Sequence, residues 1–237
     1  MTYRTALRAL IVGLTGSVLT HTPALARQGM NRLTASERAD GWELLFDGDT
    51  TDEWRGFRQD SMPDGWKVVD GALTRVAPAG DIITKKQFQN FELQLEWKIA
   101  EAGNSGIMFR VTEDQRRAWL SGPEMQVLDD ARHRDGQVPE TSAGSNYGLH
   151  APKPGAVRAA GSWNSVRLLV RESHVEHWLN GVKVVEYELE SPEWERLVSQ
   201  TKFDTIPSYG RQRTGHIALQ DHGDRVAYRN IKIKRLP

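Results

Sequence analysis

A nine-residue stretch in which apolar and polar side chains alternate constrains the fold more than any other part of the sequence. Residues 91–99 read FELQLEWKI, with five apolar side chains separated by four polar ones. Successive side chains of an extended strand point to opposite faces, so the pattern places every apolar group on one side. It predicts a β-strand that covers a core on one face and meets water on the other, which is typical of antiparallel sheets.

Further short strands are predicted from the turns that bound them. Asn180-Gly181 and Asp70-Gly71 are dipeptides that tolerate the positive φ angles of two-residue hairpin turns, so their flanking residues should pair. Residues 107–111 follow the turn-rich sequence Gly103-Asn104-Ser105-Gly106, which predicts that this run pairs with 91–99. Other strands are expected at residues 166–170, 217–221 and 228–234.

The fold class that follows is an all-β, antiparallel β-sandwich with one short peripheral helix. The helix is expected at residues 194–198, because Ser191-Pro192-Glu193 supplies an N-cap, a proline at the first helical position and an early acidic side chain. Residues 129–161 are rich in glycine and proline and are expected to form a long loop. A chain of 237 residues lies within the range of one such domain.

The N-terminal 26 residues predict a secretory signal peptide. Arg4 and Arg8 precede an apolar run at 10–19, and Ala24-Leu25-Ala26 has the small residues of a cleavage site. The run is shorter than the roughly 20 residues that span a bilayer, so no membrane span is expected after cleavage. We therefore expect residues 1–26 to be removed, 27–40 to form a polar leader without a strong helix or strand pattern, and 41–237 to fold in the periplasm or cell envelope.

Composition narrows the possible partners. Loss of Arg4 and Arg8 leaves the mature chain with a formal net charge of −2. Nucleic acids and anionic membranes require clustered positive charge, so neither is an expected partner. The sequence has no cysteine, and an exported domain of this kind must therefore be stabilised without disulfides.

Alternation also predicts which polar residues share a face. In residues 124–129, Met125 and Val127 should face the core, which turns Glu124 and Gln126 to the opposite side. By the same rule, Gln220 and His222 should lie opposite the apolar residues 217 and 219.

Arg110 is predicted to point outward, opposite Ile107, Phe109 and Val111. If the three segments share a concave sheet, a cation, a carboxylate, an imidazole and two amides converge. Such groups suit a sugar, because amides pair with hydroxyls and an acid–base pair moves protons. The alternative is that these are ordinary solvated residues on the wet face of a sandwich. His150, in the long loop, is a candidate to close over the cleft, with a surface role as its alternative.

An ordered series of motifs resembles the 3-keto-disaccharide hydrolase domain family, formerly a domain of unknown function. The resemblance covers residues 41–237. The motifs are Gly41-Trp42, Leu45-Phe46-Asp47-Gly48, Trp66-Lys67-Val68, Gly103-Asn104-Ser105-Gly106-Ile107, Glu124-Met125-Gln126-Val127-Leu128-Asp129, Tyr147-Gly148-Leu149, Trp163-Asn164, His177-Trp178-Leu179-Asn180-Gly181 and Gly215-His216-Ile217-Ala218-Leu219-Gln220-Asp221-His222-Gly223.

This resemblance implies a concanavalin A-like jelly-roll sandwich that cleaves glycosides already oxidised to a ketone at C3. The ketone acidifies the C2 hydrogen, so a base removes it and the C1 group leaves by β-elimination. His222 or Glu124 would be the base, and the same two residues would hold a divalent metal if one is used. Arg110 would steady negative charge. Hydroxyls or metal ligands would be held by Asn104, Gln126, Gln220 and Asp221.

The substrate expected from the resemblance is an oxidised (3-keto) glycoside, which a sugar 3-dehydrogenase would supply. A non-catalytic, lectin-like carbohydrate-binding module is the alternative function, because sandwiches of this kind are widely binding proteins and fold does not fix function. A structural envelope protein is a third alternative. The combination of Arg110, Glu124 and His222 favours an enzyme, since a lectin face needs no acid–base pair.

Overall fold

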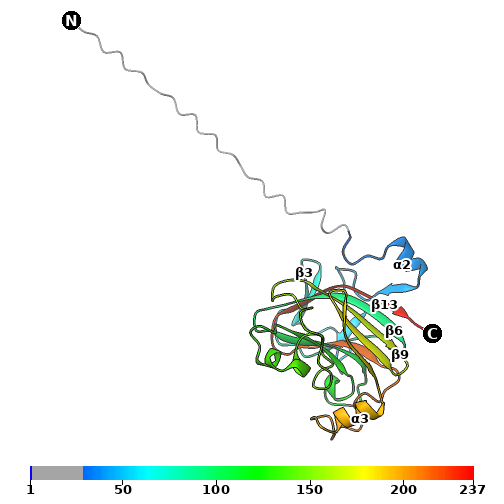
Figure 1. Cartoon of the computed structure of the whole chain (residues 1–237). Coiled ribbons are helices and arrows are strands. Elements are labelled where there is room, and N and C mark those ends of the chain that lie inside the picture. The colour runs from blue at the N-terminus through cyan, green and yellow to red at the C-terminus, as the bar shows by residue number, and fades with distance from the viewer. Residues whose placement is uncertain (2–28) are drawn as a thin grey trace.

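Two antiparallel β-sheets packed face to face form the body of the protein (Figure 1). The structure is a computed structural model and describes Met1 and residues 29–237. The predicted signal peptide, apart from Met1, lies outside the described residues. The expected all-β, concanavalin A-like jelly-roll sandwich is confirmed, and its core lies between the two sheets.

Sheet A has eight strands in the order β11-β10-β9-β6-β13-β4-β3, with β1 paired to β13. Its strands are β1 (Trp42–Leu44), β3 (Trp66–Val69), β4 (Ala72–Arg75), β6 (Phe91–Ile99), β9 (Asn164–Arg171), β10 (His174–Leu179), β11 (Val182–Glu188) and β13 (Val226–Arg235). Sheet B has five strands in the order β2-β5-β12-β7-β8. Its strands are β2 (Trp54–Gly56), β5 (Ile82–Thr84), β7 (Asn104–Val111), β8 (Glu124–Leu128) and β12 (His216–Leu219).

The alternating stretch forms β6, as predicted. Buried and half-buried residues alternate along its whole length, and the side chains of Phe91, Leu95 and Trp97 are at most 2% exposed. The hairpins β3–β4 and β10–β11 are also confirmed, with positive φ angles at Asp70-Gly71 and Asn180-Gly181. Local turn chemistry and pleat parity therefore account for most of sheet A.

The predicted pairing of residues 107–111 with 91–99 is wrong. Strand β7 lies in sheet B between β12 and β8, whereas β6 lies in sheet A between β9 and β13. The chain crosses from one sheet to the other at residues 100–103, where Ala102 has a φ of 54°. The two strands place Leu95 and Ile107 in the same core, so they stack their apolar faces rather than share an edge.

A β-bulge changes the pleat of β7 near its end. His216 pairs with Val111 and Ala218 pairs with Met108, so three steps along β7 match two steps along β12. Arg110 adopts a φ of 52° at this bulge. Beyond an extra residue the inward and outward faces exchange, and Val111 accordingly packs beside Met108 on the outer side of sheet B. The prediction that Val111 faces the central core is therefore wrong.

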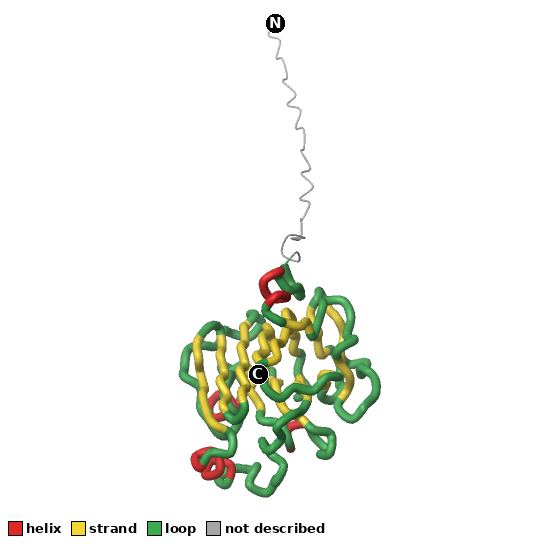
Figure 2. Tube along the Cα trace, turned by 90° about the vertical axis from the view of Figure 1, so that its right-hand side faces the viewer, coloured by secondary structure: helices red, strands yellow, loops and turns green. Residues whose placement is uncertain are grey.

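The predicted peripheral helix is α3 (Pro192–Val198), and its N-cap is Ser191, whose Oγ accepts a hydrogen bond from the Trp194 amide. A second helix, α2 (Ala35–Ala39), was not expected. It begins with a reciprocal capping box between Thr34 and Glu37. The two helices lie at opposite ends of the sandwich (Figure 2). The structure therefore has a second helix where only one was expected, and this helix lies within the leader predicted at residues 27–40.

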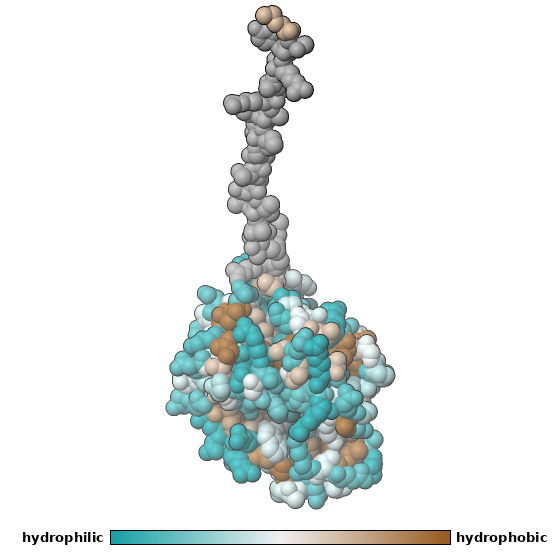
Figure 3. Space-filling model, turned by 90° about the vertical axis from the view of Figure 1, so that its left-hand side faces the viewer, coloured by the Kyte–Doolittle hydropathy of each residue, from teal (hydrophilic) through white to brown (hydrophobic). Residues whose placement is uncertain are grey.

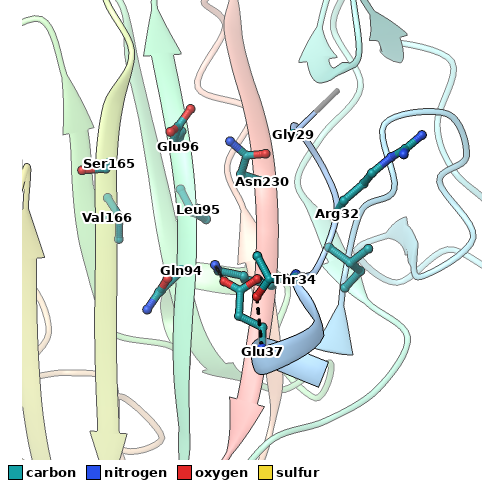
Figure 4. Close-up of a pocket in the computed structure, with 12 residues that line it drawn as sticks. Gly29, Arg32, Thr34, Glu37, Gln94, Leu95, Glu96, Ser165, Val166 and Asn230 are labelled. Atoms are coloured by element: carbon teal, nitrogen blue, oxygen red, sulfur yellow. Dashed lines mark hydrogen bonds and ion pairs between the residues drawn. The ribbon is translucent and has the colours of Figure 1, made fainter. Parts of the chain in front are cut away.

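Residues 29–40, which we call the leader, pack on sheet A. Asn31 and Asn230 exchange hydrogen bonds through their backbone amides and side-chain oxygens, at 2.6 and 2.7 Å. Between the leader and strands β6, β9 and β13 lies a hollow of about 280 Å³ (Figure 4). Its carboxylates, Glu37 and Glu96, are ion-paired with Lys232 and Arg229, so neither is available for acid–base chemistry there.

The long loop at 129–161 contains only short 3₁₀ turns, η2 (Arg134–Gln137) and η3 (Pro139–Thr141), and a third turn, η1 (Ala118–Leu120), precedes β8. The surface in Figure 3 is mostly hydrophilic, with hydrophobic areas that are small and separate. Across the described part of the chain, the helices are too short and too polar to cross a bilayer.

Candidate active site

A polar cavity of about 170 Å³ opens on the outer side of sheet B, where β7 and β8 meet four loops. Buried side chains from the two strands form its floor, and half-buried or exposed side chains from the loops form its rim. The residues that line it are Asn104, Trp119, Glu124, Gln126, Tyr147, Lys202, Gln220 and His222. Five of these were predicted as site residues.

Glu124 supplies the carboxylate of the floor. It is the first residue of β8, and Met125 and Val127 face the core as predicted, which leaves Glu124 on the cavity side. Burial raises the pKa of Glu124 to about 8, while Lys202 acts in the opposite direction and Asp81 and Asp135 add smaller increases. A carboxyl group with such a pKa exchanges protons near neutral pH, as general acids and bases do.

Gly106 makes room for this carboxylate on the neighbouring strand. A Cβ atom at position 106 would lie 1.9 Å from Oε1 of Glu124, which is far inside contact distance. The glycine in the Gly103–Gly106 motif is therefore required by the site rather than by a turn, and residues 104–106 are part of β7.

Three amide oxygens on the cavity lack a hydrogen-bond partner within the described chain. They are Oδ1 of Asn104, Oε1 of Gln126 and Oε1 of Gln220. The Gln126 amide nitrogen donates to the Thr141 carbonyl at 3.2 Å, which orients that side chain. Buried acceptors without partners are costly, so these oxygens are matched to a ligand that carries hydroxyl donors or a cation.

His222 lies at the rim and is exposed. Its ring meets that of His133 edge-on, with centroids 6.5 Å apart. Its imidazole nitrogens can accept or donate a proton or bind a metal. The structure thus brings Glu124 and His222 to one cavity, with the Gln220 side chain beside them.

Asp221 was predicted to bind substrate, but it lies outside the cavity. Its carboxylate pairs with Arg75 at 2.7 Å and accepts hydrogen bonds from the amides of Ala79 and Gly80. These contacts hold the segment that carries Gln220 and His222. The residue therefore shapes the site without lining it.

The prediction that Arg110 shares a face with Glu124 is wrong. Its Nη2 donates to the backbone carbonyls of Glu172, at 2.7 Å, and Gln89, at 3.1 Å, and the side chain does not line the cavity. The reason is the bulge in β7, because simple alternation does not hold at its left-handed residue. The guanidinium ties loops together instead of facing a substrate.

His150 also lies away from this cavity. Its ring stacks on Tyr187, with centroids 4.7 Å apart, and Asn146 Nδ2 lies 3.0 Å from His150 Nδ1. It lines a different hollow, between β11 and α3. Burial lowers the pKa of His150. The expectation that this residue closes over the cleft is not matched by its position.

Sequence reasoning missed Trp119, Tyr147 and Lys202, which lie on loops and carry no periodic signal. Tyr147 belongs to one of the family-like motifs, and this was the available clue. Asp81 was also missed. Its Oδ1 accepts a hydrogen bond from the Asp221 amide at 2.9 Å, and burial raises its pKa to about 6.

The cavity offers donor atoms of the kinds that divalent cations use. Glu124 and the partner-free amide oxygens are oxygen donors of the kind that Mg²⁺, Mn²⁺ and Ca²⁺ prefer, and His222 adds an imidazole nitrogen, which suits Zn²⁺. Within residues 29–237, a denser group of such side chains occurs on sheet A, at His174, Glu176 and Glu186. Lys183 pairs with both of those glutamates and Arg167 pairs with Glu176, so their charge is compensated without an ion.

Comparison with known proteins places this chain among sugar-cleaving enzymes. It is 31% identical over 250 residues to a 3-keto-disaccharide hydrolase of Bacteroides thetaiotaomicron, covering 92% of this chain and 86% of that protein. The crystal structure of a candidate glycosyl hydrolase from Parabacteroides distasonis superposes with a TM-score of 0.81 at 35% identity, over 88% of this chain and 100% of that one. A second such structure from the same organism gives 0.67 at 30%, over 82% and 99%.

These names indicate a glycosyl hydrolase-type enzyme, and the family match covers the whole sandwich. Residues 41–234 match the 3-keto-alpha-glucoside-1,2-lyase-like domain. The matched range contains both sheets and every residue that lines the cavity. The chain belongs to the 3-keto-alpha-glucoside-1,2-lyase-like domain family.

Proposed function

We propose that the protein cleaves glycosides that carry a ketone at C3 of the sugar, by abstraction of the C2 hydrogen and β-elimination of the group on C1. The observation that carries this proposal is a buried carboxyl group, Glu124, whose pKa is raised to about 8 beside three partner-free amide oxygens. A proton-exchanging group and hydroxyl-binding groups thus share one hollow.

The electron movements of this reaction are balanced without an oxidant. Removal of the C2 proton places its electron pair between C2 and C3 and moves the carbonyl pair onto the C3 oxygen. When the carbonyl re-forms, the pair makes a C1–C2 double bond and the C1–O bond breaks. The leaving oxygen takes a proton, and addition of water to the double bond then gives net hydrolysis.

Glu124 and His222 are the two proton-exchanging candidates for this role. Glu124 rises from the floor and His222 stands at the rim, so a sugar in the cavity would lie between them. One would take the C2 proton and the other would serve the leaving group or a metal. The amide oxygens of Asn104, Gln126 and Gln220 would accept hydrogen bonds from sugar hydroxyls.

A divalent metal, if bound, would be held by whichever of Glu124 and His222 does not take the C2 proton, together with the amide oxygens, and would stabilise negative charge on the oxidised sugar as a Lewis acid. The substrate would come from a sugar 3-dehydrogenase, because the C3 ketone must be made first. The signal-like sequence of residues 1–26 supports a periplasmic or cell-envelope location for the reaction.

The proposal is tested with purified mature protein and 3-keto-trehalose in deuterated buffer, with and without chelator. We expect release of the aglycone and deuterium at C2 of unreacted substrate. Glu124→Gln and His222→Asn should each lower kcat by about 10²–10⁴-fold, the usual contribution of a positioned acid or base. Glu101→Gln, an exposed glutamate paired with Arg132, is the matched control.

Absence of turnover on any 3-keto-glycoside, with or without added Mg²⁺ or Mn²⁺, contradicts the proposal. Binding of glycans that is unchanged in both variants, with no turnover in the parent protein, would instead indicate a carbohydrate-binding module.

A further inference from the structure

One cation at the cavity rim is held in an unusual aromatic setting. Lys202 lies in the segment between α3 and β12, and its Nζ is 4.5 Å from the ring centroid of Tyr147 and 4.8 Å from that of Trp119. The ring of Phe203 is 5.2 Å away. The faces of aromatic rings carry negative potential, so three of them together favour a charged ammonium at this position.

The same ammonium faces the reaction cavity. Lys202, Trp119 and Tyr147 line it together with Glu124. The charges of Lys202 and Glu124 act on each other, since each shifts the pKa of the other toward the ionised form. Desolvation by the surrounding groups lowers the pKa of Lys202, and this effect is the largest on that group.

The Lys202 charge is not consumed by an ion pair. Within the described chain, no carboxylate lies within ion-pair distance of Nζ. Arg110 provides the contrast, because its guanidinium is committed to backbone carbonyls away from the cavity. Lys202 is therefore the cation that the cavity itself offers to a ligand.

Stacked rings fix the segment that carries this lysine. Phe203 stacks on Tyr209 with centroids 3.9 Å apart, and Tyr209 stacks on Trp194 of α3 at 5.8 Å. The planes are nearly parallel, at 9° and 6°. All three rings are buried, so the backbone on the C-terminal side of Lys202 is anchored in the core although the lysine itself is exposed.

We propose that Lys202 is a catalytic residue of the 3-keto-glycoside cleavage, whose ammonium stabilises the negative charge that develops on the C3 oxygen when the C2 proton leaves. This inference rests on the proposed function. Lys202 keeps its three protons throughout and forms no covalent bond. A charged donor aimed at a developing oxyanion stabilises the transition state more than the ground state, and bound sugar excludes water from the rim.

The test compares Lys202→Met and Lys202→Arg with the parent protein on 3-keto-trehalose. Lys202→Met should lower kcat by about 10²–10³-fold, the usual cost of losing one oxyanion donor. KM should change less than kcat, and deuterium exchange at C2 should slow in parallel. Lys202→Arg should retain more activity than Lys202→Met because it retains the charge. Lys85→Met, at an exposed lysine away from the cavity, is the matched control.

Two further measurements separate charge from packing. Lys202→Ala should regain activity in a saturable way with added ethylammonium, which a purely structural role would not produce. Borohydride treatment of the parent protein with substrate should leave the mass of the chain unchanged.

Each opposing result has a distinct meaning. A parent protein that cleaves 3-keto-trehalose together with an equally active Lys202→Met overturns the role of Lys202 and leaves the proposed function intact. A sugar adduct on Lys202 after borohydride overturns the electrostatic role in favour of a covalent one. A folded Lys202→Ala variant that ethylammonium does not restore also counts against the inference. Failure of the parent protein to cleave any 3-keto-glycoside overturns the proposed function itself.

Discussion

Glycine at position 106 leaves the space that the Glu124 carboxylate occupies. In Gly106→Ala the new methyl group would lie 1.9 Å from Oε1, and the flexible end of the glutamate would have to move. We therefore expect kcat to fall by at least tenfold, since a small misplacement of a catalytic group costs up to about 10²-fold. The melting temperature should change little.

Gly29→Ala is the control for this prediction, because no atom lies within 4 Å of a Cβ at that position. Equal kcat values for the parent protein and Gly106→Ala would show that the Glu124 position does not matter for the reaction.

Arg110 departs from the alternation of inward and outward side chains because it lies at the β-bulge in β7. Arg110→Ala removes part-buried hydrogen bonds to two backbone carbonyls, and such a hydrogen bond contributes about 0.5–1.5 kcal/mol to stability. We expect the free energy of unfolding, measured with urea, to fall by about that amount while kcat is unchanged. A large loss of kcat without a loss of stability would indicate that Arg110 takes part in the reaction.

His177 should make stability depend on pH. It is fully buried, its Nδ1 lies 3.1 Å from the Gly144 carbonyl, and burial lowers its pKa from 6.5 to about 4. The unfolded chain therefore takes up this proton first as the pH falls. The contribution of His177 to stability is complete above about pH 6.5, falls between 6.5 and 4, and levels off below 4, with a total near 3 kcal/mol.

Urea midpoints measured between pH 7.5 and 4 would test this, and His177→Gln should flatten the decline. His174→Gln is the control, because the Glu188 partner raises the pKa of His174 and its contribution has the opposite slope. A decline that is equally steep in His177→Gln would assign the effect to other groups.

At the scale of elements, the leader is attached more firmly than its composition indicates. Asn31 is 4% exposed and makes three hydrogen bonds, two with Asn230 and one with the Gly71 carbonyl at 2.8 Å. Asn31→Ala should lower the free energy of unfolding by about 1–3 kcal/mol through the groups left unpaired. Hydrogen exchange in residues 29–40 should accelerate, with kcat unchanged.

Arg32→Ala, which alters a neighbour that lines the hollow shown in Figure 4, is the matched control. Unchanged exchange in Asn31→Ala would mean that the leader is held by other contacts, such as the Glu37–Lys232 pair.

Strand identity was predictable from the sequence where local rules decide it. The period of two in residues 91–99 and the positive φ at Asn180 belong to a few neighbouring residues, and both were predicted correctly. The choice between pairing within one sheet and stacking across two sheets depends on which distant strands supply hydrogen bonds. The sequence of 91–111 contains no such information, so β7 was assigned to the wrong neighbour.

The positions of the cavity residues were likewise predictable only where local rules decide them. Glu124 and Gln126 were placed on the correct face because β8 is regular, and residues 104 and 220 also reached the cavity. Arg110 failed because one inserted residue reverses parity, and nothing in its local composition marks the bulge. Lys202 was missed because a loop residue is positioned by tertiary contacts rather than by periodicity.

For the whole molecule, the cavity joins sheet B to loops from four parts of the chain, so its occupation should stabilise the fold globally. A ligand at 100 times its dissociation constant adds about 2.7 kcal/mol to the free energy of unfolding. We expect Mn²⁺, or a 3-keto-sugar, to raise the melting temperature of the parent protein. Glu124→Gln should respond less, and an equal rise in that variant would place the ligand elsewhere.

The stacked rings of Phe203, Tyr209 and Trp194 also affect which part of the cavity rim can vary between members of the family. The strands contribute the Glu124 carboxyl group and the amides of Asn104 and Gln126, whereas the rim residue Lys202 comes from a segment held by Tyr209 and Trp194. Under the proposed function, exchange of exposed residues between these two rings, such as Lys202, would alter the cavity rim while the buried rings keep their contacts.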